Sequence, residues 1–377
     1  MIDAAQSSGR QARLRTARNA MTAELVAAGV LRDPDLRRLF QTVPRDVFVP
    51  AFYSQTVTDG TLRNRLISRD DPATASQWEQ GVYANRPLLT HPDLSSSATS
   101  PRLMAAMLEA LGEPGGPGPV LEIGTGTGYN TALLCGAFDD QVVSIDVDAD
   151  LIDTARHRLH SIDHHPRLVL GDGADGYPAD APYARLIATC GVRQLPETWV
   201  EQVQVGGRIV TPIGAGIAVL TVTGPAAAEG RFLPISAYFM QLRPLTGSGP
   251  SAPALTQARS AAGEVRAAQL PGETVLDDAF RFPLSLTLTD LTHAMTDDPN
   301  PAHLFALPDN SWARVCSGTV TQGGTRRIWD EIEDLHHEWV RGGRPTRDQY
   351  TIMIEHGQQH IGRATAPQPE GLQSGGG

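Results

Sequence analysis

Hydroxyl side chains gather in one short stretch, directly before a segment with helical periodicity. They are Ser95, Ser96, Ser97 and Thr99, and Pro101 follows them. Hydroxyls in such a run cap helix starts, and proline favours the first helical turn. Free backbone N–H groups and the helix dipole favour an anion at this position, so we expect a carboxylate to bind there. A flexible polar loop is the simpler alternative for a run of serines.

A glycine-rich turn follows between an apolar run at 120–123 and a helical segment from Tyr129. Its glycines, Gly124, Gly126 and Gly128, let a ligand approach backbone N–H groups closely. Their spacing places the third glycine one residue earlier than in the dinucleotide-binding fingerprint. An acid, Asp146, ends the next apolar run, where it can accept hydrogen bonds from a ribose diol. Together with Glu122, which precedes the turn, these features resemble the S-adenosylmethionine (SAM) site of class I methyltransferases.

The resemblance assigns a role to each residue of this region. The three glycines would approach the methionine and ribose portion of SAM, with Thr125 and Val147 beside them. Glu122 would hold the amino group, directly or through water, and Asp146 the ribose hydroxyls. Asp172 and the Gly173 backbone would read the adenine amino edge, with a simple turn cap as the alternative for Asp172.

Strands alternate with helices from residue 120 onward, which predicts an α/β fold with a doubly wound, mostly parallel sheet. We expect a Rossmann-like class I methyltransferase domain at 95–245, after an N-terminal helical cap at 1–94. The last strands of this domain would run through 231–243, and 59–77 would be an exposed loop. A linker at 246–263 would lead to a small α+β domain at 264–363, followed by a disordered tail at 364–377. In that small domain, 280–288 and 311–320 read as strands and 350–354 as an edge strand.

Composition narrows the possible partners. A net charge of −11 and the absence of a basic stripe argue against nucleic acid. No apolar run approaches the ~20 residues of a membrane-spanning helix. Three scattered cysteines are typical of a reducing cytoplasm, and neither the cysteines nor the histidine pairs have zinc-type spacing, so we expect no metal. The sequence leaves the oligomeric state open.

The region 30–245 resembles protein-L-isoaspartate O-methyltransferases. The resemblance is carried by 97–101, by 121–129, by Gly-Asp-Gly-Ala-Asp-Gly-Tyr at 171–177, by Ala-Pro-Tyr at 181–183 and by 202–214. The segment 43–50 is similar to the N-terminal cap of that family. Alignment on Pro101 places Thr99 at the family's active-site hydroxyl.

Departures from the family pattern point to a particular branch. A triple serine stands where the family has a glycine and an aromatic residue, and over a hundred residues follow the expected sheet. These features, with 311–313 and 326–333, resemble the peptide-tailoring O-methyltransferases that accompany ATP-grasp or lanthipeptide maturases. That branch implies an ordinary Asp side chain in a modified precursor peptide as the substrate. An isoaspartyl repair enzyme and a SAM-binding scaffold without catalysis remain the alternatives.

The acceptor chemistry needs no general base. An Asp carboxylate has a pKa of about 3.9 and is anionic at neutral pH. The protein must therefore align the carboxylate with the methyl group and exclude water, which hydroxyls and N–H groups can do. The methyl ester formed has methoxide as leaving group, so the next backbone nitrogen can close on the carbonyl to give a succinimide (aspartimide).

Overall fold

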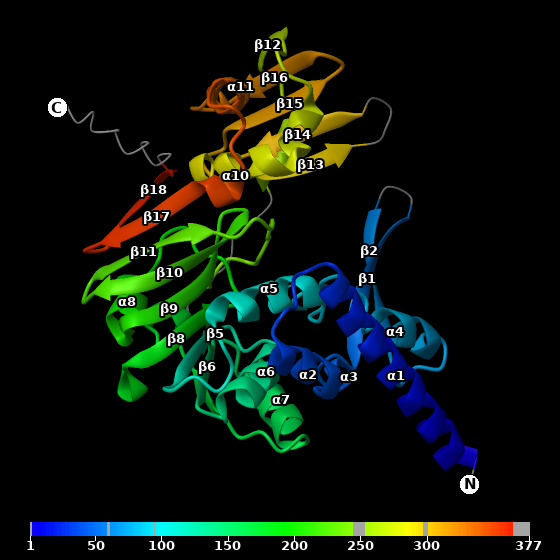
Figure 1. The fold of residues 1–377 in the computed structure, drawn as a ribbon. Helices are drawn as coiled ribbons and strands as arrows, with labels where there is room; N and C mark the ends of the chain where they lie inside the picture. Colours follow the sequence, from blue (N-terminus) through cyan, green and yellow to red (C-terminus); the bar gives the residue numbers. More distant parts are fainter. Residues whose placement is uncertain (1, 59–60, 94, 244–252, 297–300, 365–377) are drawn as a thin grey trace, which may run out of the picture.

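The computed structural model describes residues 2–58, 61–93, 95–243, 253–296 and 301–364. Three groups of elements follow one another along the chain (Figure 1). N-terminal helices and a small sheet lie on one side, a large twisted sheet lies at the centre, and a C-terminal α+β part lies against one end of that sheet.

The central sheet has nine strands, in the order β18-β17-β11-β10-β9-β8-β5-β6-β7. Its parallel half consists of β5 (Val120–Ile123), β6 (Val142–Asp146), β7 (Arg167–Leu170), β8 (Tyr183–Ala188) and β9 (Val203–Ile213). Its antiparallel half adds β10 (Gly216–Gly224), β11 (Ala227–Phe232), β17 (Tyr350–Glu355) and β18 (Gln358–Arg363). This confirms the expected doubly wound α/β fold.

The strand order reverses beside β5. The chain runs from β5 outward to β6 and β7, and then returns to β8 on the other side of β5. Ligands of such sheets bind outside the carboxyl ends of the strands at this switch point. The glycine-rich turn leaves β5 at that place.

Side chains of the buried strands alternate between the two faces of the sheet. Val120 packs into one core with Met104 of α5 (Pro101–Leu111) and Leu133 of α6 (Tyr129–Phe138). Leu121 packs into the opposite core with Trp199 of α8 (Glu197–Gln202). The helix α7 (Ala149–His160) packs against β6 and β7.

The N-terminal part is not purely helical. It contains α1 (Ile2–Ala27), α2 (Pro34–Thr42), α3 (Arg45–Phe48) and α4 (Ala75–Gly81). It also contains a four-stranded sheet of β1 (Ala51–Thr58), β2 (Thr61–Ser68), β3 (Leu88–Leu89) and β4 (Ser97–Ala98). The loop expected at 59–77 is therefore wrong where β2 and α4 form, because Ile67 and Trp78 are buried in the core beneath them.

The C-terminal part forms a five-stranded sheet with its own core. The strands are β12 (Glu264–Ala267), β13 (Thr292–Thr296), β14 (Ala302–Ala306), β15 (Trp312–Cys316) and β16 (Thr319–Gly323). Two further helices are α9 (Pro253–Ser260) and α11 (Ile328–Arg341). Trp329 and Trp339 lie in this core, as expected for large aromatic residues.

The strand expected at 280–288 is wrong, because this segment is the helix α10 (Asp278–Thr287). The Asp277 side chain caps it by accepting hydrogen bonds from the N–H groups of Ala279 and Phe280. Phe280 packs into the C-terminal core and Phe282 into the core of the central sheet. Burial in two different cores produced the alternating apolar pattern of a strand.

The hairpin of β17 and β18 crosses the expected domain boundary. Residues from this region pair with the central sheet, with Gly230 of β11 opposite Ile352 of β17. β17 is therefore an interior strand and β18 the edge strand. Of the tail expected at 364–377, residues 365–377 lie outside the described residues. Within the described ranges, no helix combines the length and apolar character that crossing a membrane requires.

Candidate active site at the switch point

The glycine-rich turn, which connects β5 to α6, borders a cavity. All three glycines have a positive φ: 94° at Gly124, 52° at Gly126 and 87° at Gly128. A side chain at Gly124 would place its Cβ 2.6 Å from the Thr189 hydroxyl, whereas a Cβ at Gly126 would meet no atom within 4 Å. Gly124 thus permits close packing, and Gly126 leaves open space beside the backbone. That open space is the cradle that a nucleoside cofactor requires.

The cavity has a volume of about 300 Å³. It brings together most of the residues expected at the site, namely Ser95, Ser96, Ser97, Thr99, Gly124, Gly126, Asp146, Val147 and Gly173. The remaining expected residues, Glu122, Thr125, Gly128 and Asp172, do not line it.

Asp146 lies at the carboxyl end of β6, on the cavity wall. Its Oδ2 accepts a hydrogen bond of 2.8 Å from the Gly126 N–H, and its Oδ1 accepts one of 3.2 Å from the Asp148 N–H. Burial raises the pKa of this carboxyl. The two hydrogen bonds orient the carboxylate towards the turn, where it can accept from a ribose diol.

Glu122 lies behind the turn and is fully buried. Its carboxylate accepts hydrogen bonds from the Asn130 amide at 2.7 Å, the Thr131 hydroxyl at 2.5 Å and the Ser144 hydroxyl at 2.6 Å. Burial raises its pKa to about 7. Glu122 does not line the cavity, so a direct contact with the amino group of SAM is not supported, and its observed contacts join β5, α6 and β6. The expected contact through water stays a prediction.

Asp172 and Gly173, which were expected to read the adenine amino edge, also have local structural roles. The Asp172 carboxylate accepts a hydrogen bond of 2.9 Å from the Ala174 N–H, which corresponds to the turn-cap alternative. A Cβ at Gly173 would lie 2.5 Å from Ile123 and 2.9 Å from Leu242. Gly173 therefore allows the wall formed by these two side chains to close.

The hydroxyl stretch forms the facing wall. Ser97 pairs with Leu89 in a short antiparallel ladder, which joins the stretch to β3. Ser96 is buried and its hydroxyl accepts from that of Thr90 at 3.3 Å. Ser97 and Thr99 line the cavity, and among the described residues their hydroxyls have no hydrogen-bond partner. These two hydroxyls are free to donate to a carboxylate.

Arg45 fixes this wall and was missed by sequence reasoning. Its guanidinium is fully buried and donates to the backbone oxygens of Val82 at 2.8 Å and Thr99 at 3.2 Å. Burial lowers its pKa to about 10, so it stays cationic at neutral pH. The only signal in the sequence was an arginine inside the apolar segment 43–50. Arg45 is a positioning residue for Thr99.

The segment from Tyr238 to Arg243 covers the cavity. It was expected to be the last strand, but β11 ends at Phe232 and this segment crosses the carboxyl end of the sheet. The Gly191 N–H donates to the Met240 oxygen at 2.7 Å, and the Leu242 N–H donates to the Gly191 oxygen at 2.8 Å. These bonds join the segment, which we call the roof, to the chain after β8.

The electrostatics suit a carboxylate acceptor. Among the described residues that line the cavity there is no histidine. Cys190 also lines it, and burial raises the pKa of its thiol to about 12, so it stays protonated and does not compete for a methyl group. An acceptor that is already anionic would need no general base from this lining.

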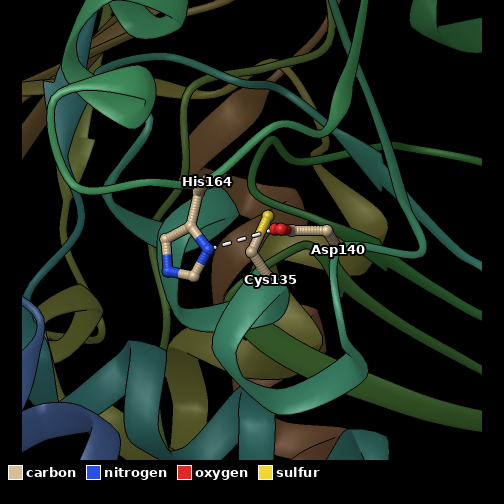
Figure 2. A group of neighbouring side chains, drawn as sticks. All are labelled: Cys135, Asp140 and His164. Atoms are coloured by element: carbon tan, nitrogen blue, oxygen red, sulfur yellow. Dashed lines mark hydrogen bonds and ion pairs between the residues drawn. The ribbon is translucent and has the colours of Figure 1, made fainter.

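A second group of side chains lies apart from the cavity. Figure 2 shows Cys135 of α6 beside Asp140 and His164, whose possible ligand atoms lie within 4.8 Å of one another. His164 Nδ1 and Asp140 Oδ1 are 3.1 Å apart. Burial is the main cause that raises the pKa of the Cys135 thiol, and a hydrogen bond to Asp140 raises it further. The group joins the end of α6 to the loop before β7 by hydrogen bonds, and none of its members lines the cavity.

Comparisons with known proteins agree with this geometry. The family model described as "Protein-L-isoaspartate(D-aspartate) O-methyltransferase (PCMT)" matches residues 16–224, more than half of the 377 residues. The protein-L-isoaspartate O-methyltransferase 1 of Anaeromyxobacter sp. is 33% identical over 227 residues, which are 59% of this chain and 93% of that protein. The protein-L-isoaspartate O-methyltransferase of Halorhodospira halophila is 37% identical over 183 residues, 47% of this chain and 81% of that protein.

A solved structure of a protein-L-isoaspartate O-methyltransferase shares the fold, with a TM-score of 0.52 and 21% identity. The alignment covers 92% of this chain and all of that chain. Since the family model spans more than half of the sequence and the relatives match over most of their own length, the chain belongs to the protein-L-isoaspartate(D-aspartate) O-methyltransferase family and is a SAM-dependent carboxyl O-methyltransferase.

Proposed function

We propose that this enzyme methylates the side-chain carboxylate of an ordinary Asp in a ribosomally synthesised, modified peptide. The most specific form of the proposal is a peptide cyclised by an ATP-grasp ligase. The observation that carries the acceptor chemistry is the pair of unpartnered hydroxyls, Ser97 and Thr99, on a cavity wall without a histidine. The triple serine and the region after residue 224, where the family match ends, support the peptide-tailoring branch.

One wall of the cavity would bind SAM and the facing wall would bind the acceptor carboxylate. SAM, when bound, supplies an electrophilic methyl group on a sulfonium. The glycine turn and Asp146 would hold it, with Gly126 providing space and Asp146 the acceptor for the ribose. Ser97 and Thr99 would donate hydrogen bonds to one carboxylate oxygen and leave the other free to attack. The roof at 238–243 would keep water out.

The expected product follows from the bonds that form and break in the two steps. The attacking oxygen forms a bond to the methyl carbon as the carbon–sulfur bond breaks, which leaves a methyl ester. The backbone nitrogen of the next peptide residue then bonds to the ester carbonyl, its proton passes to solvent, and methanol leaves. The succinimide formed, or the products of its hydrolysis, would be the species isolated.

A second candidate is repair of isoaspartyl residues. It is favoured by the names of the relatives and by the solved isoaspartate methyltransferase, whose alignment covers 92% of this chain. Both candidates share the same cofactor site. They differ only in the acceptor that reaches Ser97 and Thr99.

The two candidates are separated by offering the enzyme both acceptors. Mass spectrometry would follow methyl transfer to an Asp-containing macrocyclic peptide and to a linear isoaspartyl peptide. We expect a methyl ester and then loss of methanol on the macrocycle. Turnover of the isoaspartyl peptide alone would reverse the order, and SAM binding without transfer to either would favour a scaffold.

The assignment of the hydroxyl wall has its own test. Thr99→Ala should lower methyl transfer while SAM affinity, measured by calorimetry, stays unchanged. Thr319→Ala, an exposed threonine on β16, is the matched control. Unchanged transfer by both Thr99→Ala and Ser97→Ala would remove these residues from the acceptor site.

A further inference from the structure

A second, larger cavity lies where the C-terminal part meets the central sheet. Its volume is about 560 Å³. Ile213 of β9 and Ile361 of β18 contribute from the sheet, Leu286 from α10 and Trp339 from α11. We call it the junction cleft. Figure 1 shows β17 and β18 at the edge of the central sheet, on the side that faces α10.

The walls of the junction cleft are held in place. The Gln359 side chain accepts from the Leu195 N–H at 3.0 Å and donates to the Arg193 oxygen at 3.1 Å, which fixes β18 to the chain after β8. Phe282 of α10 stacks edge-on against Tyr350 of β17, with 5.0 Å between ring centroids. The cleft is therefore preformed, as binding sites usually are.

The junction cleft adjoins the active-site cavity. Gln241, in the roof, lines both. Its backbone forms a parallel bridge with Gly191, and its side chain is exposed and has no hydrogen-bond partner among the described residues. A polymer whose side chain enters beside Thr99 and whose backbone crosses Gln241 would continue into the junction cleft.

The chemistry of the cleft matches a peptide. Its floor is apolar at Leu286 and Ile361, and the exposed hydroxyls of Thr287 and Thr289 can bond to backbone amides. The rim carries both signs of charge, with Glu338 and Arg363. Arg363 is exposed and forms no ion pair within the described part of the chain. A nucleic acid would require a basic lining and a lipid a continuous apolar one.

We propose that the junction cleft binds the segment of the acceptor peptide that flanks the methylated residue, with an apolar side chain over Leu286 and a carboxylate beside Arg363. This inference rests on the proposed peptide substrate. It assigns to the C-terminal part the selection of long substrates over short ones.

The test compares peptide lengths. One peptide has a central acceptor and about seven residues on each side. The other has about two on each side, so at ~3.3 Å per residue it extends only ~7 Å from the acceptor and cannot run along the cleft as the long peptide does. Both are made with Asp and with isoaspartate as acceptor. The variant Thr289→Trp places a large ring at the exposed cleft wall, and Thr319→Trp places the same ring on β16, outside the cleft.

We expect Thr289→Trp to raise KM for the long peptide about tenfold, the effect of a few lost contacts, and to leave KM for the short peptide unchanged. The unchanged short peptide shows that the variant is folded. Equal KM values for Thr289→Trp and Thr319→Trp on the long peptide would overturn the proposal. So would an equal loss on both lengths.

The design separates this inference from the proposed acceptor. If only isoaspartyl peptides are methylated, the proposal of an ordinary Asp acceptor is wrong. The KM values of Thr289→Trp and Thr319→Trp on the long isoaspartyl peptide then still test whether the cleft binds the flanking segment. If neither acceptor is methylated, fluorescence anisotropy of the labelled long peptide measures its binding to the cleft without turnover. Tighter binding by the wild type than by Thr289→Trp supports the cleft, and equal binding refutes it.

Discussion

Replacing Glu122 by glutamine should remove a specific pH dependence of stability. The Glu122 carboxyl is fully buried, and burial raises its pKa from 4.5 to about 7. Each pKa unit corresponds to ~1.4 kcal/mol, so the ionised form costs the folded protein ~3 kcal/mol relative to the unfolded chain. Glutamine keeps the shape and has no charge to bury.

The direction follows from proton binding. The folded chain holds the Glu122 proton more tightly than the unfolded chain does, so the unfolding free energy falls as the pH rises from 4.5 to about 7. Glutamine does not titrate and loses this slope. Its carbonyl can still accept from Asn130, and the hydroxyls of Thr131 and Ser144 can turn to accept from its amide.

The measurement is urea unfolding of the wild type and Glu122→Gln at about pH 5 and about pH 8, where Glu122 is mostly protonated and mostly ionised. Because the unfolded chain already ionises near pH 4.5, we expect the variant to gain ~2.5 kcal/mol on the wild type between the two conditions. Glu229→Gln, at an exposed position on β11, is the control and should follow the wild type. Parallel curves for Glu122→Gln and the wild type would show that burial does not hold the proton on Glu122.

Three further variants test the walls of the active site. Gly126→Ala should weaken SAM binding in calorimetry, because its Cβ enters the open cradle; Gly115→Ala, also at positive φ in open space but outside the cavity, should bind SAM normally. Asp146→Asn should lower SAM affinity by about tenfold, since the charged acceptor for the ribose is lost, and an unchanged affinity would place the ribose elsewhere. Arg45→Met should destabilise the protein by ~2 kcal/mol in thermal unfolding and lower kcat, because the Thr99 backbone oxygen loses its donor. Normal kcat would contradict the positioning role of Arg45.

Local sequence patterns were sufficient for the centre of the fold. The strand, the glycine turn and the helix lie within about a dozen residues of one another. Each glycine adopts a positive φ that the turn itself requires, so the pattern can be recognised from neighbouring residues alone. Asp146 could be placed because the apolar run of β6 ends at that residue. The hydroxyl stretch directly precedes α5, and Ser97 and Thr99 line the cavity from that position.

Long-range contacts decided what the sequence left open or suggested wrongly. Phe280 and Phe282 alternate like strand residues, yet α10 forms because two separate cores receive them. The roof at 238–243 and the bond from Arg45 to Thr99 join residues far apart in the chain, so no local pattern encodes them. Glu122 is close to the glycines in sequence, but three donors from α6 and β6 enclose its carboxylate in a buried network away from the cavity lining. The sequence by itself thus determined which backbone segment can bind the cofactor. Tertiary packing determined which side chains line the cavity, because a side chain's access depends on the distant residues that pack around it.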